Sequence, residues 1–153
     1  MLHFVYLTGC DPAGYTRDHF RDVRNLEPHP EFRDYMSNAF SPVGVYLSFW
    51  QPKTEAASVR SLPVMLVNDE NRYVNGTLTL TLESKEGTRA PTQMTGFRIS
   101  PLGQETVYRN FRFPDASGDF LLRAVIHYRE NETDSSRQSR RHVKLVKSDG
   151  GRE

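Results

Sequence analysis

The sequence predicts a mainly β protein: a seven-strand β-sandwich of the immunoglobulin or fibronectin type, with a helical appendage at its N-terminus. Two observations predict this fold. Seven short apolar or alternating runs follow one another between residues 45 and 146, each bounded by turn residues, and this spacing is typical of such sandwiches. Ahead of them, residues 31–40 carry apolar side chains at helical spacing.

The composition bounds the kind of protein. The 153 residues (17.6 kDa) contain 25% charged and 37% hydrophobic residues, as expected of a soluble globular domain. A net charge of +1 argues against a dedicated nucleic-acid binder. One cysteine excludes an internal disulfide and a multi-cysteine metal site. No apolar run reaches the ~20 residues of a membrane-spanning helix, and a catalytic barrel of ~250 residues does not fit this length.

The first ten residues match a targeting signal only in part. Leu7-Thr8-Gly9-Cys10 fits the cleavage pattern of a bacterial lipoprotein, in which Cys10 would carry the lipid. A secretory signal needs a basic start and then an apolar stretch of about 7–15 residues, but no Lys or Arg precedes Arg17, and His3 interrupts the apolar run. The favoured alternative is a short strand or buried loop at 4–7. The compartment stays open, and would be periplasmic or extracellular if a parent protein is secreted.

A helix is expected at residues 31–40. Pro30 suits the first helical position, where its missing N–H would be unpaired anyway, and Glu31 complements the positive end of the helix dipole. The apolar stripe falls at i, i+3, i+4, i+7 and i+8, and consists of Phe32, Tyr35, Met36, Ala39 and Phe40. Since such a stripe needs a surface to cover it, Phe32, Tyr35, Met36 and Phe40 are candidates for a domain-packing face. A weaker helical turn is expected around 17–26.

The chain is expected to divide near Ser41-Pro42. Residues 1–43 carry a net charge of −2 and form the appendage, whereas residues 44–153 carry +3 and form the sandwich. The seven strands are predicted at 45–50, 59–68, 74–83, 95–99, 105–113, 119–129 and 142–146. The clearest is 74–83, where three leucines alternate with three threonines. Residues 131–136 are expected to form a loop.

No local motif for metal, phosphate or nucleophilic chemistry is present. The five histidines, at positions 3, 19, 29, 127 and 142, show no metal-ligand spacing. A Gly-rich phosphate loop and a Gly-x-Ser-x-Gly elbow are missing. We therefore expect no cofactor, no metal and no catalytic residue in this chain. His127 and His142 are expected to face solvent.

Two charged clusters have alternative interpretations. A pair of N-terminal carboxylates could perform glycosidase chemistry, although solvated faces and caps are the simpler explanation; the candidates are Asp18, Asp22, Glu27, Glu31 and Asp34. The C-terminal basic run could bind anions or form a charged edge strand that resists pairing. The edge strand is favoured, because no aromatic residues are interleaved; the run consists of Arg137, Arg140, Arg141, His142, Lys144 and Lys147.

The first predicted strand is apolar on both faces. Tyr46, Ser48 and Trp50 share one face, and Val45, Leu47 and Phe49 share the other. Apolar residues on both sides predict burial on both sides, so one face should enter the core. The other should pack against a neighbouring domain or the N-terminal helix. Alternatively Tyr46 and Trp50, together with Tyr73, could stack on a sugar.

Several stretches carry a family resemblance. They are residues 32–52 (FRDYMSNAFSPVGVYLSFWQP), 64–69 (VMLVND) with 76–78 (GTL), 101–104 (PLGQ), and 118–124 (GDFLLRA) with 139–141 (SRR). Over residues 32–147 the chain thereby resembles the junction between the catalytic barrel and the C-terminal immunoglobulin-like sandwich of bacterial family-two-like glycoside hydrolases, the β-galactosidase type.

The resemblance implies that residues 1–43 correspond to the tail of a catalytic barrel, and residues 44–153 to the non-catalytic sandwich that follows it. The catalytic glutamates of that family lie upstream, and no position here matches them. The implied function is an accessory domain or fragment of a glycoside hydrolase, without activity of its own. Its partner would be the parent's catalytic domain or its own helix. The alternatives are a free-standing carbohydrate-binding or adhesion module, and a small enzyme using the N-terminal carboxylates.

Overall fold

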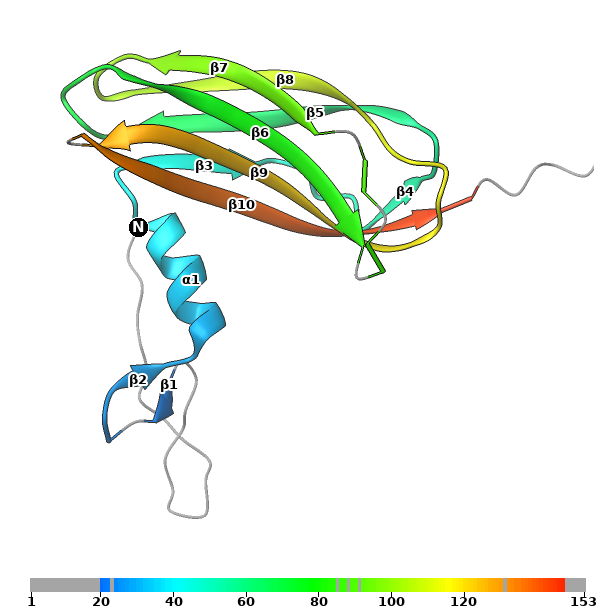
Figure 1. Cartoon of the computed structure of the whole chain (residues 1–153), viewed down its shortest axis with the longest axis horizontal. Coiled ribbons are helices and arrows are strands. Elements are labelled where there is room, and N and C mark those ends of the chain that lie inside the picture. The colour runs from blue at the N-terminus through cyan, green and yellow to red at the C-terminus, as the bar shows by residue number, and fades with distance from the viewer. Residues whose placement is uncertain are drawn as a thin grey trace, which may run out of the picture. The chain divides into compact units, whose positions relative to one another are not determined.

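The computed structural model describes residues 20–22, 24–84, 86–87, 89–90, 92–130 and 132–147. The chain forms two compact units, Met1–Phe40 and Ser41–Glu153. The structure is mainly β, with one short helix (Figure 1). The lipoprotein-like motif and residues 4–7 lie outside the described residues.

The first unit contains a small hairpin and the helix. Strands β1 (Phe20–Asp22) and β2 (Glu27–Pro28) pair antiparallel. The Asp22 carboxylate accepts hydrogen bonds from the backbone N–H groups of Arg24 (2.9 Å) and Asn25 (3.3 Å), which fixes the turn between them. The prediction of a helical turn around 17–26 is therefore wrong for the described residues 20–22 and 24–26, because this side chain competes with helix formation by bonding to its neighbours' backbone.

The predicted helix is confirmed as α1 (Pro30–Ala39). Pro30 occupies its first turn, the N–H of Arg33 donates to the His29 carbonyl (3.0 Å), and the N–H of Phe40 donates to the Met36 carbonyl (2.9 Å). No residue of α1 is buried. Phe32 and Met36 are half-buried, whereas Tyr35 and Phe40 are about half exposed. No helix among the described residues is long and apolar enough to cross a membrane.

The second unit consists of two sheets. The five-stranded sheet has the order β4-β10-β9-β6-β7, and the three-stranded sheet the order β3-β5-β8. Neighbours pair antiparallel, except that β4 runs parallel to β10. The strands are β3 (Val43–Leu47), β4 (Lys53–Glu55), β5 (Val59–Asn68), β6 (Val74–Ser84), β7 (Gln93–Ile99), β8 (Gly103–Arg112), β9 (Gly118–Glu130) and β10 (Thr133–Val146).

One hydrophobic core lies between the two sheets. On β5, β6 and β9 every second residue is buried in it over most of the strand, as the alternating sequence predicts. On β9 the buried side chains are Phe120, Leu122, Ala124, Ile126 and Tyr128, and they face Leu62, Val64 and Leu66 of β5 within the same cluster. Aromatic rings close one end of the core, where Phe113 lies 5.3 Å from Phe111 and 6.1 Å from Phe49 between ring centroids.

The strand count differs from the prediction. Ten strands are found among the described residues, not seven. The three additional strands, β1, β2 and β4, have only two or three residues each, which is too short to show an alternating pattern. The first predicted strand also ends earlier, at Leu47, where its pairing with Val64 of β5 ends.

The largest discrepancy concerns the last strand. β10 begins at Thr133, so the expected loop at 131–136 is a strand over its described residues from 133. This half of β10 carries serines and charged residues in place of alternating apolar ones. It is held by antiparallel pairing with β9, in which Thr133 lies opposite Glu130 and Arg137 opposite Ile126. Pairing with the preceding strand therefore overrides weak local propensity.

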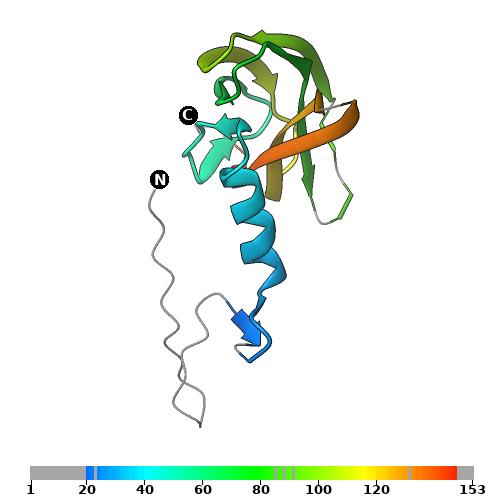
Figure 2. The same ribbon diagram turned by 90° about the vertical axis from the view of Figure 1, so that its left-hand side faces the viewer.

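Strands β3 and β10 belong to different sheets but lie alongside each other (Figures 1 and 2). The N–H of Leu47 donates to the buried hydroxyl of Ser139 (3.0 Å). Nearby, Nε of Arg137 donates to the hydroxyl of Ser41 (2.6 Å). Polar side chains of β10 thus satisfy groups at the edge of β3 that no strand pairs with.

Candidate functional site

The structure brings together two of the three aromatic residues that the sequence suggested as contact residues. The rings of Tyr46 and Trp50 lie 6.2 Å apart between centroids, tilted by 52°. Tyr46 is 38% and Trp50 is 68% exposed, whereas Leu47 and Phe49 on the other face of the segment are buried. One face of this segment enters the core, as predicted, and the other is open to a contact.

An arginine from the other sheet covers this pair. The guanidinium of Arg141 lies 4.3 Å from the centre of the Trp50 ring and 5.1 Å from that of Tyr46. Arg141 lies on β10, on the side that faces the open edge of β3. Because the cation lies against the indole, part of the Trp50 surface is already in contact with a protein group.

The aromatic pair is part of a larger exposed surface, which we name the aromatic face. The strand register places Tyr46 opposite Met65, Gly44 opposite Val67, and Pro63 opposite Tyr108. All these side chains lie on the outer side of the three-stranded sheet, because the residues that alternate with them are buried. Tyr108 is 65% exposed, and Met65 and Val67 are half-buried. The aromatic face consists of Tyr46, Trp50, Met65, Val67 and Tyr108.

The third aromatic residue lies elsewhere. Tyr73 is 54% exposed and comes after β5, which ends at Asn68. Trp50 comes after β3, whose last residue pairs with Val64 of β5. The two aromatic residues therefore follow strands that run in opposite directions. The Tyr73 ring is covered by the Arg98 guanidinium, 4.3 Å from the ring centre. Tyr73 is therefore not part of the aromatic face. The helix face predicted from Phe32, Tyr35, Met36 and Phe40 lies on α1 in the first unit.

The N-terminal carboxylates make local contacts where they are described. The amide of Asn25 donates to Asp22 (2.7 Å) and, with backbone N–H groups, lowers the pKa of the Asp22 carboxyl. Glu27 pairs with Arg21 across the hairpin, and Glu31 lies in the first turn of α1. Asp18, His3, His19 and Cys10 lie outside the described residues. Within the described part of the chain, no three His, Cys, Asp or Glu residues are grouped as metal ligands.

The basic C-terminal strand differs from a simple edge strand. Lys144, Leu145 and Val146 of β10 pair with β4, so this end lies inside the sheet. Arg137 ion-pairs with Glu130 (3.7 Å) and lies 5.9 Å from the centre of the buried Tyr128 ring. Burial raises the pKa of the Tyr128 phenol. His142 and His127 are exposed, as predicted.

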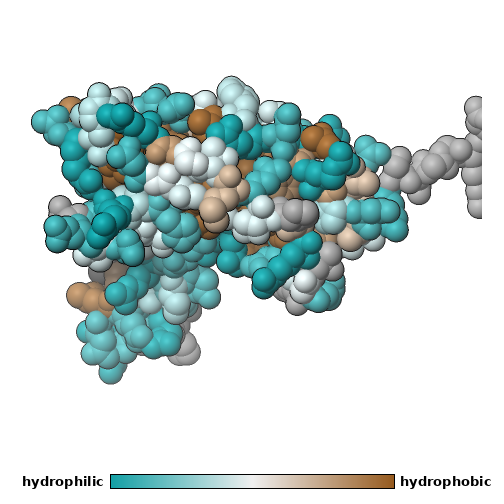
Figure 3. Space-filling view, turned by 45° about the horizontal axis from the view of Figure 1, so that its top comes forward, coloured by the Kyte–Doolittle hydropathy of each residue, from teal (hydrophilic) through white to brown (hydrophobic). Residues whose placement is uncertain are grey.

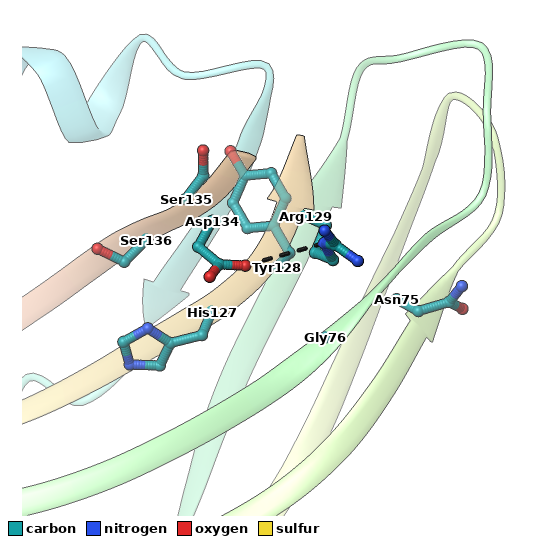
Figure 4. A pocket seen from close by; sticks show the side chains of 8 residues that line it. All are labelled: Asn75, Gly76, His127, Tyr128, Arg129, Asp134, Ser135 and Ser136. Carbon is teal, nitrogen blue, oxygen red and sulfur yellow. Dashed lines mark ion pairs between the residues drawn. The ribbon is translucent and has the colours of Figure 1, made fainter. Parts of the chain in front are cut away.

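A second candidate surface lies on the outer side of the five-stranded sheet. A hollow of about 470 Å³ opens there between the ends of β6, β9 and β10. In Figure 4 the carboxylate of Asp134 lies between the side chains of His127 and Arg129. It forms an ion pair with Arg129 (3.9 Å). Figure 3 shows a molecular surface dominated by hydrophilic side chains, with hydrophobic ones in small separate spots.

The sequence matches no family model, and no curated protein matches it significantly. Solved structures match in fold. The C-terminal domain of Wzt has a TM-score of 0.50 and 13% identity, covering 63% of this chain and 65% of that chain. A family 123 glycoside hydrolase from Clostridium perfringens has a TM-score of 0.48 and 9% identity, covering 70% and 27%. The alkylpurine DNA glycosylase AlkC of Pseudomonas fluorescens has a TM-score of 0.46 and 11% identity, covering 75% and 34%.

These likenesses concern the fold alone, and this chain spans less than two thirds of the length of each of the three proteins. The sequence comparisons give no support to a β-galactosidase-type domain.

Sequence reasoning missed Arg141 as a partner of Trp50, and Met65, Val67 and Tyr108 as further members of the aromatic face. The alternation of β5 carried a signal for Met65 and Val67, because every second residue from Leu62 to Asn68 is buried. On β8 only Phe111 is buried, so its pattern is weaker. Which outer rows become neighbours depends on strand order and register, which alternation leaves undetermined.

Proposed function

We propose that this chain provides a non-catalytic, immunoglobulin-like β-sandwich domain of a β-galactosidase-type glycoside hydrolase. In this proposal the aromatic face packs against another domain of the parent enzyme. Residues 1–43 are the end of the catalytic domain, and residues 44–153 are the accessory domain that follows it. The motifs spread over residues 32–147 support the family, and the aromatic face supports the packing role.

The observation that carries the packing role is the composition of the aromatic face. Trp, Tyr and Arg are the residues most enriched at the energetically important centres of protein interfaces. Here Trp50, two tyrosines and Arg141 gather on one side of a sheet whose other side is the core. Met65 and Val67 fill the space between them in the strand register. A surface of this kind matches the core of an interface better than it matches ordinary solvated surface.

The same geometry favours packing over sugar stacking at Trp50. A sugar ring stacks on an aromatic face that is free of protein, and the Arg141 guanidinium, 4.3 Å from the centre of the Trp50 ring, occupies one of the two faces of the indole. Arg98 occupies one face of the Tyr73 ring in the same way. Arginine and tryptophan stacked in advance have already lost much of their rotational freedom, which lowers the cost of ordering them in an interface.

A charge on the aromatic face tests the proposal. In the parent polypeptide that contains this chain, Met65→Asp should lower the melting temperature of the catalytic domain, because a carboxylate would be buried in the interface. Met94→Asp is the matched control, since Met94 lies on β7 of the other sheet and is 70% exposed. Equal melting temperatures for the two variants would contradict the packing role.

The family assignment has its own test. Reading the coding sequence upstream of Met1 should show a continuous frame that encodes a catalytic barrel. The purified chain by itself should not hydrolyse nitrophenyl glycosides. Turnover by the purified chain that is lost in Asp22→Asn or Glu31→Gln would instead support a small enzyme with N-terminal carboxylates.

A further inference from the structure

A second surface with hollows runs along the outer side of the five-stranded sheet, away from the aromatic face. The side chains of β9 that alternate with its core residues point to this side, and they are Leu121, Arg123, Val125, His127 and Arg129. The register aligns them with outward residues of both neighbouring strands. Thr77, His127 and Ser136 form one row, and Thr81, Arg123 and Arg140 form another.

Three hollows follow one another along this side and share lining residues, and together we name them the polar trough. The first hollow, of about 470 Å³, and the second, of about 300 Å³, share His127. The second and the third, of about 220 Å³, share Glu83 and Arg123. From Arg129 to Leu121 the trough follows eight steps along β9, a length of roughly 26 Å at about 3.3 Å per residue. This length suits an extended chain molecule better than a single small one.

The arginines that line the trough are paired with carboxylates. Arg123 and Arg89 pair with Glu83 (3.1 and 3.5 Å), and Arg129 pairs with Asp134 (3.9 Å). The remaining described carboxylate of the lining is Asp119, in the third hollow. The described lining thus holds three arginines and three carboxylates, and Arg140 of the neighbouring row lies outside the lining. A polyanion such as nucleic acid needs unpaired basic groups, whereas each arginine of the lining has a carboxylate within 4 Å.

The trough also differs from a protein-binding surface. No large hydrophobic side chain of β6, β9 or β10 that lines it is exposed among the described residues, whereas Tyr46, Trp50 and Tyr108 on the other sheet are. Met94 of the edge strand β7, opposite Thr79, is 70% exposed but lies outside the three linings. Addition of a peptide strand needs a free sheet edge, but β6 and β9 are paired on both sides. What the trough presents is hydroxyl, amide, imidazole and ion-paired groups, from Thr79, Thr81, Asn75, His127 and Ser136.

We propose that the polar trough binds a neutral, linear oligosaccharide. Sugar hydroxyls both donate and accept hydrogen bonds, so they match a surface on which donors and acceptors alternate. This inference goes beyond the packing role of the aromatic face and does not depend on it. The rings of Tyr128 and Phe120 border the hollows but are buried in the core. Because the described lining thus exposes no Phe, Tyr or Trp ring on which a sugar could stack, the dissociation constant should be on the order of 1 mM.

Nuclear magnetic resonance of the full ¹⁵N-labelled chain tests the proposal. The probes are cellohexaose, maltohexaose and β-1,4-galactotetraose, with hexagalacturonate as an anionic comparison. At least one neutral probe should shift the backbone amide signals of Thr77, Thr81, Arg123 and His127 in a saturable way. The amides of Tyr46, Met65 and Tyr108 should not move.

A double variant, Asn75→Ala with His127→Ala, should bind about tenfold more weakly, because two exposed hydrogen-bonding groups are lost. Tyr108→Ala with Asn110→Ala on the other sheet is the matched control and should bind like the original chain. Amide spectra of both variants verify the fold. Four outcomes would each overturn the proposal: no shift with any neutral probe, tighter binding of hexagalacturonate, shifts confined to the aromatic face, or equal affinity of the Asn75/His127 variant and the original chain.

Discussion

The guanidinium of Arg141 on β10 lies 4.3 Å from the centre of the Trp50 ring, and so connects the five-stranded sheet to the segment that follows β3 of the other sheet. The Leu47 N–H to Ser139 hydroxyl bond spans the same gap (3.0 Å). These two contacts hold the unpaired edge of β3 beside β10. They thereby keep Trp50, a member of the aromatic face, against β10.

The Arg141–Trp50 contact should contribute measurably to stability. A double-mutant cycle with Arg141→Ala and Trp50→Ala should give a coupling energy of about 0.5–1 kcal/mol, the usual range for an exposed cation–aromatic pair. Urea unfolding should be followed by circular dichroism and not by tryptophan fluorescence, because Trp50→Ala removes the only tryptophan of the chain. The same cycle with Arg141 and Tyr108 should give no coupling. A zero value for the first cycle would show that the stacking does not contribute.

Gly76 should tolerate no side chain. A Cβ atom there would lie 2.2 Å from the His127 carbonyl oxygen and 2.7 Å from the Phe97 ring, so Gly76→Ala should destabilise the fold by about 3 kcal/mol or more. At Gly44, also in a strand, the nearest atom would be 4.0 Å away, and Gly44→Ala should change stability by less than about 1 kcal/mol. Similar urea midpoints for the two variants would contradict the close packing of β6 on β9.

Asn68 should be needed for the turn between β5 and β6. Its fully buried amide donates to the carbonyls of Arg72 (2.7 Å) and Ser100 (2.8 Å), and its oxygen accepts from the Glu70 N–H (3.1 Å). Asn68→Ala should cost about 2–3 kcal/mol, since it leaves these groups without a partner. Asn110→Ala at an exposed position should cost less than about 0.5 kcal/mol. A loss of stability in Asn68→Ala as small as that in Asn110→Ala would mean that water replaces the Asn68 amide.

Tyr128 should make the fold sensitive to alkaline pH. Burial raises the pKa of its phenol above the ordinary value of about 10. The unfolded chain then releases this proton at a lower pH than the folded chain, so stability should fall as pH rises above about 10. Tyr128→Phe should reduce the loss between about pH 9.5 and 11 in urea titrations, whereas Tyr108→Phe should not. An unchanged pH dependence in Tyr128→Phe would assign the alkaline loss to other groups.

The sequence by itself determined the mainly β character, a helix within one residue of its observed ends, and the buried faces of β6 and β9. These properties are set by short-range patterns: an apolar residue every three or four positions, or every second one. The alternation of Leu78, Leu80 and Leu82 with threonines is an example, because the leucines are buried and the threonines face outward. The exposure of His127 follows from the same rule.

Only the tertiary structure decided which strands and surfaces are neighbours. Leu47 and Ser139 are 92 residues apart in the chain, and no local pattern encodes such a pairing. The polar half of β10 forms a strand because β9 offers it backbone partners, and β4 exists because β10 continues past Lys144. The aromatic face and the polar trough arise in the same way. Each is assembled from the outward residues of three strands, whose order and register depend on the packing of the whole core.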